Sequence, residues 1–331
     1  MTAEGQQQRK LVEVPDALRG FGRWQHQGEA GSRWLAALPD TVVEWCDRWN
    51  LKVDGRPMHG YNSLVVPVSR GSEPLALKVT WPDRHMEEQV LALRLWDGHG
   101  AVRLVDADTA AGVMLMRRLD HTRSLRDVPL EEAVPVIGTV LRRLAVEPPH
   151  GLRTTGAIAA QHRRELAAQW EDLGRPMPRR TLDRGLELAG ELSRDDYSVL
   201  VNNDLHYEQV LRTWDEDWAV VDPLIVSGVL EFQVAPLLWS RFDELGSSRV
   251  EWCIDALADA ADLDRDRARR WALLRAVEYW LWGLKASLTE DPVRCRHITE
   301  ALMCPRGVPV AVSIRWARGP RRAEEAGDTD P

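Results

Sequence analysis

The sequence predicts an α+β protein with two lobes, a small β-rich N-terminal lobe and a mostly helical C-terminal lobe. Two observations support this fold class. Between residues 51 and 116, short apolar runs are separated by Gly- and Pro-containing turns, with one helical pattern among them, as expected for a small antiparallel sheet. Beyond residue 124, apolar residues recur at helical spacing through most of the chain.

Composition narrows the class of protein. The chain has 331 residues, of which 44% are hydrophobic and 28% charged, enough for a sizeable core. A net charge of −8 disfavours nucleic-acid binding. No apolar run approaches the roughly 20 residues of a membrane span, and the polar start, Met1 to Lys10, has no signal core. The four cysteines form no C-x-x-C pair, so reduced thiols and a cytoplasmic location are expected.

The first part of the chain is predicted to hold the N-terminal lobe. Residues 1–30 are polar and rich in Gly and Gln, and a loosely ordered segment is expected there. The lobe itself is assigned to residues 31–118 and begins with a helix over 31–50 that Pro39 interrupts. Strands are expected at 51–53, 63–68, 75–79, 101–105 and 112–116, with a helix at 86–96 before the last two.

The second lobe is assigned to residues 119–304 and the tail to residues 305–331, which are rich in Pro, Gly and charge. Helices are expected near 131–147, 157–173, 181–193, 231–245, 248–260 and 265–289. They surround a hairpin near residues 198–222 that carries the polar residues considered next.

The hairpin places two acids and an amide in a recognisable order. Asp204 follows an apolar strand, Gln209 comes five residues later, and a second apolar run ends at Asp222. Acid, amide at plus five, hairpin and acid is the layout of a kinase catalytic loop with its magnesium site. Asp204 would accept a proton from a hydroxyl group, and Gln209 and Asp222 would supply oxygen ligands to Mg²⁺. The alternative is a surface hairpin with polar loop residues.

A nucleotide would need a partner for its phosphates in the first lobe. Lys78 is the one charge in an apolar strand, and such a lysine can reach phosphates when a helix carboxylate holds it. Glu87 and Glu88 are the available carboxylates; neighbouring helix positions diverge by about 100°, so only one can face Lys78, and Glu88 is carried forward. The turn that includes Gly60 and Ser63 would cradle the phosphates, although it lacks a G-x-G-x-x-G pattern and an ordinary hairpin turn is the alternative.

With these motifs, the chain resembles small-molecule kinases of the aminoglycoside phosphotransferase superfamily, in particular the streptomycin 6-phosphotransferase and hydroxyurea phosphotransferase group. The segments that carry the resemblance are 46–52, 63–68, 76–78, 93–104, 118–120, 204–208 and 235–238. The resemblance implies a two-lobed protein-kinase-like fold with ATP and Mg²⁺ in the cleft. It implies that backbone atoms near Arg117 to Leu119 meet the adenine, that Lys78 binds phosphates, that Asp204 is the catalytic acid/base and that Asp222 binds the metal.

The chain departs from the family pattern in its amides. Gln209 stands where such kinases carry Asn, and the stretch Gly228 to Gln233 lacks the two acids that usually follow the metal-binding Asp, the second of which braces the catalytic loop. The third departure is that the helix glutamate before Trp96 is not at a clean family position. These changes keep open a second hypothesis, a catalytically weak pseudokinase that binds nucleotide as a sensor or partner protein.

The leading hypothesis is an ATP-dependent phosphotransferase that acts on a hydroxyl of a small polar molecule such as an aminoglycoside, hydroxyurea or an amino sugar. A protein kinase is disfavoured because neither an activation segment nor an A-P-E motif follows Asp222. Asp243, Glu278 and Trp282 are candidates for acceptor binding, chosen by residue type and by their place in the C-terminal part.

Overall fold

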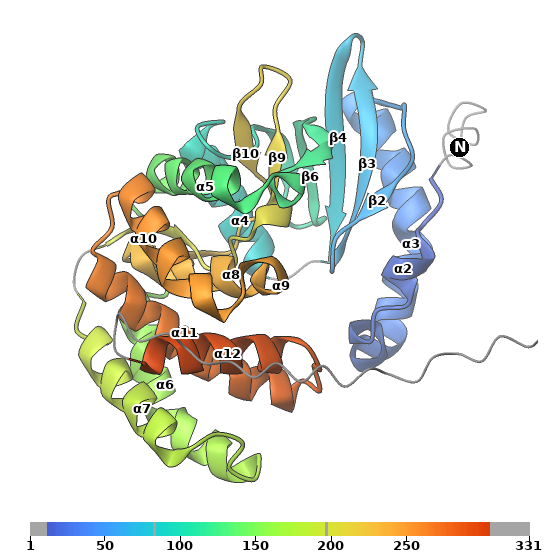
Figure 1. Ribbon diagram of the computed structural model, residues 1–331. Helices are drawn as coiled ribbons and strands as arrows, with labels where there is room; N and C mark the ends of the chain where they lie inside the picture. The colour runs from blue at the N-terminus through green and yellow to red at the C-terminus, as the bar shows by residue number, and fades with distance from the viewer. Residues whose placement is uncertain (1–11, 82–83, 196–197, 305–331) are drawn as a thin grey trace, which may run out of the picture.

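The computed structural model describes residues 12–81, 84–195 and 198–304, which form two lobes (Figure 1). The elements of the first lobe are α2 (Asp16–Arg19), α3 (Arg23–Trp49), β1 (Lys52–Val53), β2 (Met58–His59), β3 (Ser63–Arg70), β4 (Glu73–Thr80), α4 (Arg84–Trp96), β5 (Leu104–Asp108) and β6 (Val113–Arg117). The strands form one antiparallel sheet in the order β1-β3-β4-β6-β5, and β2 pairs with β3 on the same edge as β1, nearer the start of β3. The last strand of this sheet along the chain, β6, ends at Arg117.

The second lobe is mostly helical. Its longer elements are β7 (Asp120–Ser124), α5 (Leu130–Leu144), α6 (Thr155–Asp172), α7 (Arg179–Leu192), β8 (Val199–Asn202), β9 (Val210–Arg212), β10 (Trp218–Val220), β11 (Ile225–Gly228), α8 (Val234–Trp239), α9 (Phe242–Leu245), α10 (Val250–Ala261), α11 (Arg265–Lys285) and α12 (Asp291–Met303). Short 3₁₀ turns η2 (Tyr207–Gln209) and η3 (Leu230–Gln233) lie between them. Two small sheets, β10-β9-β7 and β11-β8, complete this lobe. Strand β10 contacts α5, and Figure 1 shows the two side by side.

Strand alternation in β4 separates the core from the cleft. Successive side chains of a strand point to opposite faces. Leu77 and Val79 belong to the buried cluster that also contains Leu38 and Val42 of α3, whereas Lys78, between them, lies on the opposite face. Its pairing partners in the sheet are Val65 and Met114. The same alternation that builds the core of the first lobe therefore places one lysine on the face that meets the second lobe.

The N-terminal segment differs from the expectation. Residues 1–30 are predicted to be loosely ordered, but residues 12–30 contain α2 and the start of α3; residues 1–11 lie outside the described part of the chain. Leu18 and Trp24 are buried, and Phe21 contacts the rings of His59 and Tyr61 at centroid distances of 5.7 and 5.1 Å. A few well-spaced large apolar residues thus order a stretch whose average composition is polar.

Two other expectations are corrected. The strand predicted at 101–105 begins only at Leu104, because Val102 donates its backbone N–H to Val220 of the second lobe instead of joining the sheet. The helix predicted over 231–245 is divided into η3, α8 and α9; Pro236 has no N–H to donate and therefore lies in the first turn of α8. Helix α12 packs along α11 and was not predicted (Figure 1).

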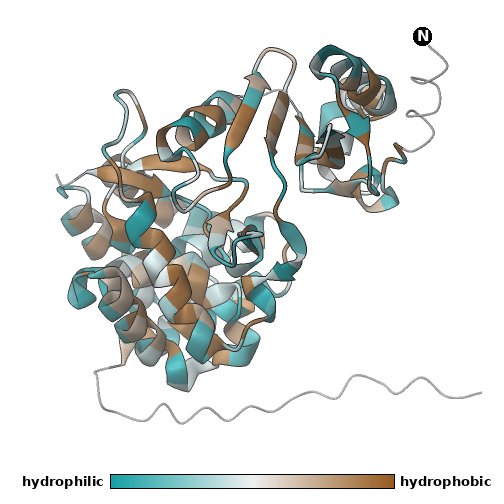
Figure 2. Cartoon of the chain, turned by 90° about the horizontal axis from the view of Figure 1, so that it is seen from above, coloured by the Kyte–Doolittle hydropathy of each residue, from teal (hydrophilic) through white to brown (hydrophobic). Residues whose placement is uncertain are grey.

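The helices of the second lobe are amphipathic. In Figure 2 hydrophobic and hydrophilic residues share the same helices, and their buried residues join one continuous hydrophobic cluster that extends to α4 of the first lobe. Within the described ranges, no helix has both the length and the apolarity that a membrane span requires.

Candidate active site

The hairpin β9–β10 brings the amide and the second acid together. Val210 pairs with Val220, and the next residues are joined by a hydrogen bond from the Val221 backbone N–H to the Gln209 carbonyl (2.8 Å). Gln209 and Asp222 therefore lie at the same end of the hairpin. Asp222 has a backbone φ of 55°, in the left-handed region, where Asp is tolerated better than most residues because of its short polar side chain.

A buried asparagine ties the two acidic loops to each other. The Asn202 side-chain oxygen accepts hydrogen bonds from the backbone N–H groups of Asp204 and Leu224, each at 3.2 Å. Asn202 in turn donates its own backbone N–H to Oε1 of Gln233 (3.0 Å). Gln233 thus braces the strand before Asp204 through a neutral amide, at the position where the resemblance implies an acid. The sequence interpretation overlooked Asn202, although a buried Asn at a strand end next to an acid is a signal for such a brace.

Lys78 lies against Asp222, and its helix partner is an amide rather than a carboxylate. The Nζ atom of Lys78 is 2.5 Å from Oδ1 of Asp222 and donates to Oε1 of Gln89 at 3.2 Å. The Gln89 Nε2 group donates to the same Asp222 oxygen at 2.6 Å and to the Pro223 carbonyl. Only 5% of the Lys78 side chain is exposed. Lysine, amide and acid therefore form one closed hydrogen-bonded cluster between the lobes.

This cluster corrects the expectation that Glu87 or Glu88 holds Lys78. Glu87 is exposed, and Glu88 faces His85, with Oε2 3.5 Å from the ring Nδ1. The physical reason is helix phase: Met86, Gln89, Val90 and Leu93 share the buried stripe of α4, and Glu88 lies about 100° away from Gln89. A polar residue on an otherwise apolar stripe was the sequence signal that identifies Gln89.

The two acids have opposite pKa shifts. Burial pushes the pKa of the Asp222 carboxyl upward, but the Lys78 ammonium and the hydrogen bonds from Lys78 and Gln89 outweigh burial and hold the pKa below its usual value. Desolvation raises the pKa of Asp204, and the positive charge of Arg275 and the ring of His206 offset this only partly. The Asp204 side chain is exposed, so its desolvation comes from the surrounding walls of the cleft. One acid is thus kept ionised, and the other is made a better proton acceptor.

The hairpin between β2 and β3 approaches Asp222 closely. The Gly60 N–H donates to the Ser63 carbonyl (3.0 Å). A Cβ atom at Gly60 would lie 2.9 Å from Ser63 Oγ and 3.6 Å from Oδ2 of Asp222, so glycine allows the backbone to pass beside the acid. Ser63 is buried, and its hydroxyl has no hydrogen-bond partner among the described residues. The structure therefore places Gly60 and Ser63 beside the Lys78–Asp222 pair.

The residues expected near the adenine lie where the chain crosses between the lobes. Arg117 ends β6, and Leu119 precedes β7. The Arg117 N–H already donates to the Arg103 carbonyl, and the Arg118 carbonyl accepts from the indole N–H of Trp214 at 2.9 Å. A base in this crossing would therefore use other backbone groups of the same segment, among them those of Leu119.

The oxygen atoms at the end of the hairpin fit a hard divalent cation. Gln209 Oε1 is buried and has no hydrogen-bond partner among the described residues, which is costly unless a ligand satisfies it. Asp222 supplies an ionised carboxylate. Over the ranges that the structure describes, no group of three or more acids, histidines or cysteines forms a metal cage. One carboxylate and one amide oxygen suit Mg²⁺, which takes few protein ligands and completes its coordination with phosphate oxygens and water.

A cavity of about 290 Å³ opens beside the catalytic loop. It is lined by Arg153, Ile158, Gln161, His162, Glu165, Gln169, Asn203, Phe232, Arg275, Glu278, Trp282 and Lys285. Of the three acceptor candidates, Glu278 and Trp282 lie in this wall. Asp243 does not, because its carboxylate pairs with Arg294, 2.6 Å away on α12.

Arg275 was not predicted and links this cavity to the loop. Its Nη1 donates to the carbonyl oxygens of Asn203 and Phe232, each at 3.2 Å, and its guanidinium lies 4.2 Å from the Phe232 ring centroid. Because Asn203 immediately precedes Asp204, this residue of α11 holds the loop of Asp204 from the side of this cavity. An arginine within an otherwise apolar helical stripe was the available sequence signal.

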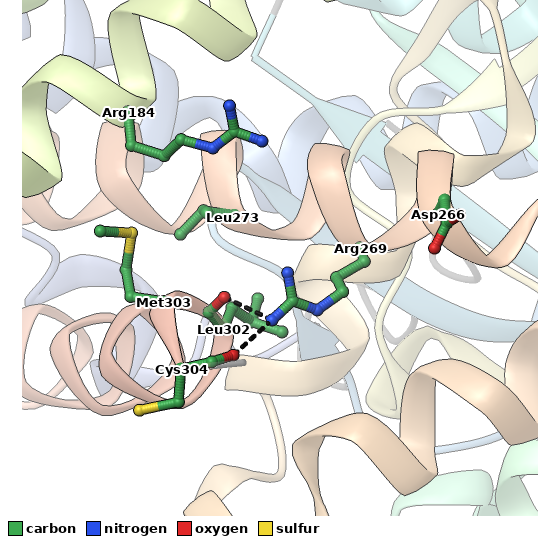
Figure 3. A pocket seen from close by; sticks show the side chains of 7 residues that line it. All are labelled: Arg184, Asp266, Arg269, Leu273, Leu302, Met303 and Cys304. Carbon is green, nitrogen blue, oxygen red and sulfur yellow. Dashed lines mark hydrogen bonds between the residues drawn. The ribbon is translucent and has the colours of Figure 1, made fainter. Parts of the chain in front are cut away.

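A larger hollow of about 430 Å³ lies away from these residues, between α7, α11 and the end of α12. Figure 3 shows Arg269 from α11 reaching the carbonyl oxygens of Leu302 and Cys304. No residue of the loop 203–209 lines it, whereas Asn203 of that loop lines the smaller cavity, so the smaller cavity is the one that lies beside Asp204.

Comparisons with known proteins agree with this geometry. A sequence profile described as aminoglycoside/hydroxyurea antibiotic resistance kinase matches residues 48–286. The chain is 36% identical over 303 residues to streptomycin 6-kinase from Streptomyces griseus, covering 89% of this chain and 98% of that protein. It is 35% identical over 302 residues to hydroxyurea phosphotransferase from Kitasatospora aureofaciens, covering 88% and 86%. The chain belongs to the aminoglycoside/hydroxyurea antibiotic resistance kinase family.

Solved structures confirm the kinase-like fold. A ternary complex of an aminoglycoside phosphotransferase with ADP and hygromycin B aligns with a TM-score of 0.56 at 14% identity, covering 78% of this chain and 97% of that chain. Choline kinase from Streptococcus pneumoniae aligns with a TM-score of 0.53 at 13% identity, covering 80% and 98%. Membership of the family makes the protein a small-molecule phosphotransferase, as the loop around Asp204 indicated.

Proposed function

We propose that the protein transfers the γ-phosphate of ATP to a hydroxyl group of a small polar molecule in the cytoplasm. The observation that carries this proposal is the convergence of Gly60, Lys78 and Asp222 between the lobes, with a cavity directly beside the loop of Asp204. Phosphoryl transfer needs positioning and charge stabilisation more than covalent chemistry. Gly60, Lys78 and Asp222 would bind the phosphates, the cavity would bind the acceptor, and Asp204 would lie between the two.

Each residue has a defined part in the proposal. Asp204 orients the acceptor hydroxyl and accepts its proton, a role that suits a carboxylate whose pKa is raised by desolvation. Lys78 binds the phosphates, and the backbone beside Gly60 and Ser63 approaches them. Asp222 and Gln209 would hold Mg²⁺, which would neutralise charge on the transferred phosphate. Backbone groups between Arg117 and Leu119 would bind the adenine.

The acceptor belongs to the small-molecule class, and the family name makes aminoglycosides and hydroxyurea the first compounds to test. The relatives are named for streptomycin and hydroxyurea. Glu278 and Trp282 are the proposed acceptor contacts, since both line the cavity beside Asn203. Asp243 is not retained in this role because it pairs with Arg294 outside the cavity.

The experiment is an ATP-consumption assay with Mg²⁺ across aminoglycosides, amino sugars and hydroxyurea. Replacement of Asp204 by Asn is expected to lower turnover by about 10²- to 10⁴-fold, the usual contribution of a general base. Glu208→Gln is the matched control, because Glu208 is an exposed acid four residues further along the same loop. Equal loss in both variants would contradict the role of Asp204.

The second candidate is a nucleotide-binding pseudokinase, favoured by the neutral amides Gln209 and Gln233. The hydrogen bond from Asn202 to Gln233 counts against it, because the brace of the loop is kept without the charge. The two candidates differ in one measurement. ATP-dependent thermal stabilisation without turnover of any acceptor would support the pseudokinase and refute the phosphotransferase.

A further inference from the structure

The cavity beside Asp204 has a composition that selects among acceptors. At about 290 Å³ it lies just below the range for ligand pockets, which runs from about 300 to 1,000 Å³. A single six-membered ring with its substituents fills such a volume, whereas a molecule of three linked rings does not fit inside it. Size alone therefore favours a compact acceptor.

The charges in the wall point the same way. The lining contains three basic residues, Arg153, Arg275 and Lys285, and two acids, Glu165 and Glu278. The charge of His162 adds nothing near neutrality, because desolvation, with Arg275 and Arg153 nearby, lowers its pKa to about 4. A polycation would meet more positive than negative side chains here. A molecule with one positive group would not suffer this repulsion if an acid receives that group.

Glu278 is the acid available for such a group. Glu165 already accepts a hydrogen bond from Gln161 at 2.8 Å. Glu278 is half-buried, yet it has no hydrogen bond and no ion pair with the residues that the structure describes, although Arg275 and Arg153 are near enough to influence it. A carboxylate removed from water without a partner is unfavourable until a donor reaches it. Desolvation accordingly raises the pKa of Glu278, and a cationic group bound beside this carboxyl would favour its charged form.

An aromatic wall stands next to Glu278. Trp282 follows Glu278 by four residues on α11, so both side chains lie on the same face one turn apart. The Trp282 ring stacks on Tyr279 (5.1 Å, 15°), which stacks on Trp239 (4.4 Å, 11°). The Tyr279 hydroxyl donates to Asp291. Stacking on Tyr279 holds the Trp282 indole in place. Trp282 is still 47% exposed, so part of the indole is open to a ligand.

We propose that the acceptor is a single-ring polyol carrying one ammonium or guanidinium group, with that group bound by Glu278 and the ring held against Trp282. This inference rests on the proposed phosphotransferase function and narrows its acceptor. Asn203 lines the cavity and immediately precedes Asp204, so the Asp204 carboxylate would meet a hydroxyl of the bound ring. Multi-ring polycations are poor acceptors because only one of their rings enters and their remaining charges face Arg153 and Lys285.

The test compares three classes of acceptor in the same Mg²⁺–ATP assay. Glucosamine represents the singly charged ring, glucose and myo-inositol represent neutral rings, and streptomycin and kanamycin represent multi-ring polycations. We expect kcat/KM to be highest for glucosamine. Higher kcat/KM for streptomycin, kanamycin or hydroxyurea overturns the inference while leaving the phosphotransferase function intact.

Substitutions test whether Glu278 and Trp282 cause the preference for glucosamine over glucose. Glu278→Gln is expected to reduce the ratio of kcat/KM for glucosamine to that for glucose by about 10- to 100-fold, the worth of a charge-assisted hydrogen bond. Trp282→Ala should raise KM for both rings, and Trp282→Phe should restore most of the affinity. Glu300→Gln, on the exposed side of α12, is the control that should leave the ratio unchanged. An unchanged ratio in Glu278→Gln overturns the assignment.

Calorimetric titration separates failure of this inference from failure of the function. Glucosamine is titrated into the protein with Mg²⁺ and a non-hydrolysable ATP analogue, and Glu278-dependent binding is expected. No binding of glucosamine overturns the inference even if ATP is consumed. Failure of the protein to bind the ATP analogue contradicts the proposed function itself.

Discussion

Replacement of Gln209 by Leu is expected to change two measurements in opposite directions. Gln209 Oε1 is buried without a hydrogen-bond partner among the described residues. An unsatisfied buried polar group costs about 1–3 kcal/mol, and an apolar group of similar shape removes that cost. Because the residue is only half-buried, we take the lower value. The variant without nucleotide should gain about 1 kcal/mol of stability, or about 1–2 °C in Tm.

The stabilisation by nucleotide should fall in the same variant. Loss of partners around a metal ligand typically weakens metal binding by about 10- to 100-fold, and loss of a direct oxygen ligand should cost at least as much. At a ligand concentration of about 100 Kd, binding stabilises a protein by about 2.7 kcal/mol, and a tenfold weaker Kd reduces this to about 1.4 kcal/mol. The Tm shift produced by Mg²⁺–ATP should therefore be roughly halved.

Thermal unfolding with and without Mg²⁺–ATP measures both effects. Gln209→Asn keeps the amide but withdraws it by one methylene, so it should show an intermediate shift. Gln27→Leu, at an exposed position of α3, is the matched control for the change of side chain. A Leu variant that is less stable than the parent without ligand and keeps its full Mg²⁺–ATP shift would refute the assignment of Gln209.

Three further predictions follow from other contacts. Gln89→Glu sets a carboxylate against the Asp222 oxygen that now accepts a hydrogen bond, so urea unfolding should show a loss of about 1–3 kcal/mol, and Gln89→Met, which adds no charge, should lose less. Arg275→Lys loosens the contact with the Asn203 carbonyl, and kcat should fall by about 10- to 100-fold; an unchanged kcat would show that α11 does not position the loop. His162 has its pKa lowered to about 4 by burial, so the unfolded chain binds the proton first, and stability should fall by about 2 kcal/mol between pH 7.5 and pH 4.5. His162→Gln should flatten this part of the unfolding profile, and an identical slope in both proteins would count against the burial of His162.

The sequence predicted the structure best where polar side chains occur at fixed positions within a regular strand pattern. Alternation in the strand 75–79 placed Lys78 opposite the core, and the order of Asp204, Gln209 and Asp222 located the hairpin. These patterns are local, and a strand whose one face is buried has its side-chain directions fixed by its own sequence. The two-lobed architecture was predictable because the spacing of apolar residues changes from strand-like to helical near residue 124.

The remaining features depend on contacts between distant residues. Gln89 reaches Asp222 across 133 positions, Gln233 reaches Asn202 across 31 and Arg275 reaches Asn203 across 72. No local spacing encodes such pairs. A search for a helix carboxylate leads only to Glu87 and Glu88, whereas the helix phase of α4 turns the neutral Gln89 toward Lys78. The start of β5 differs from the prediction because the Val102 N–H bonds to Val220 of the other lobe. The start of α8 differs because Pro236, which has no N–H, lies in the first turn of the helix.

The contact between Lys78 and Asp222 couples the binding of a metal ion to the binding of nucleotide. In the structure the ammonium and the carboxylate neutralise each other. Phosphate oxygens that draw Lys78 away leave Asp222 with a charge that a cation can satisfy, and a cation at Asp222 releases Lys78 toward phosphate. A metal ion at Asp222 and a nucleotide at Lys78 would therefore both compete with this internal ion pair, and each would favour the other by an equal free energy. Neither ligand alone should bind tightly, and release of one after phosphoryl transfer should promote release of the other.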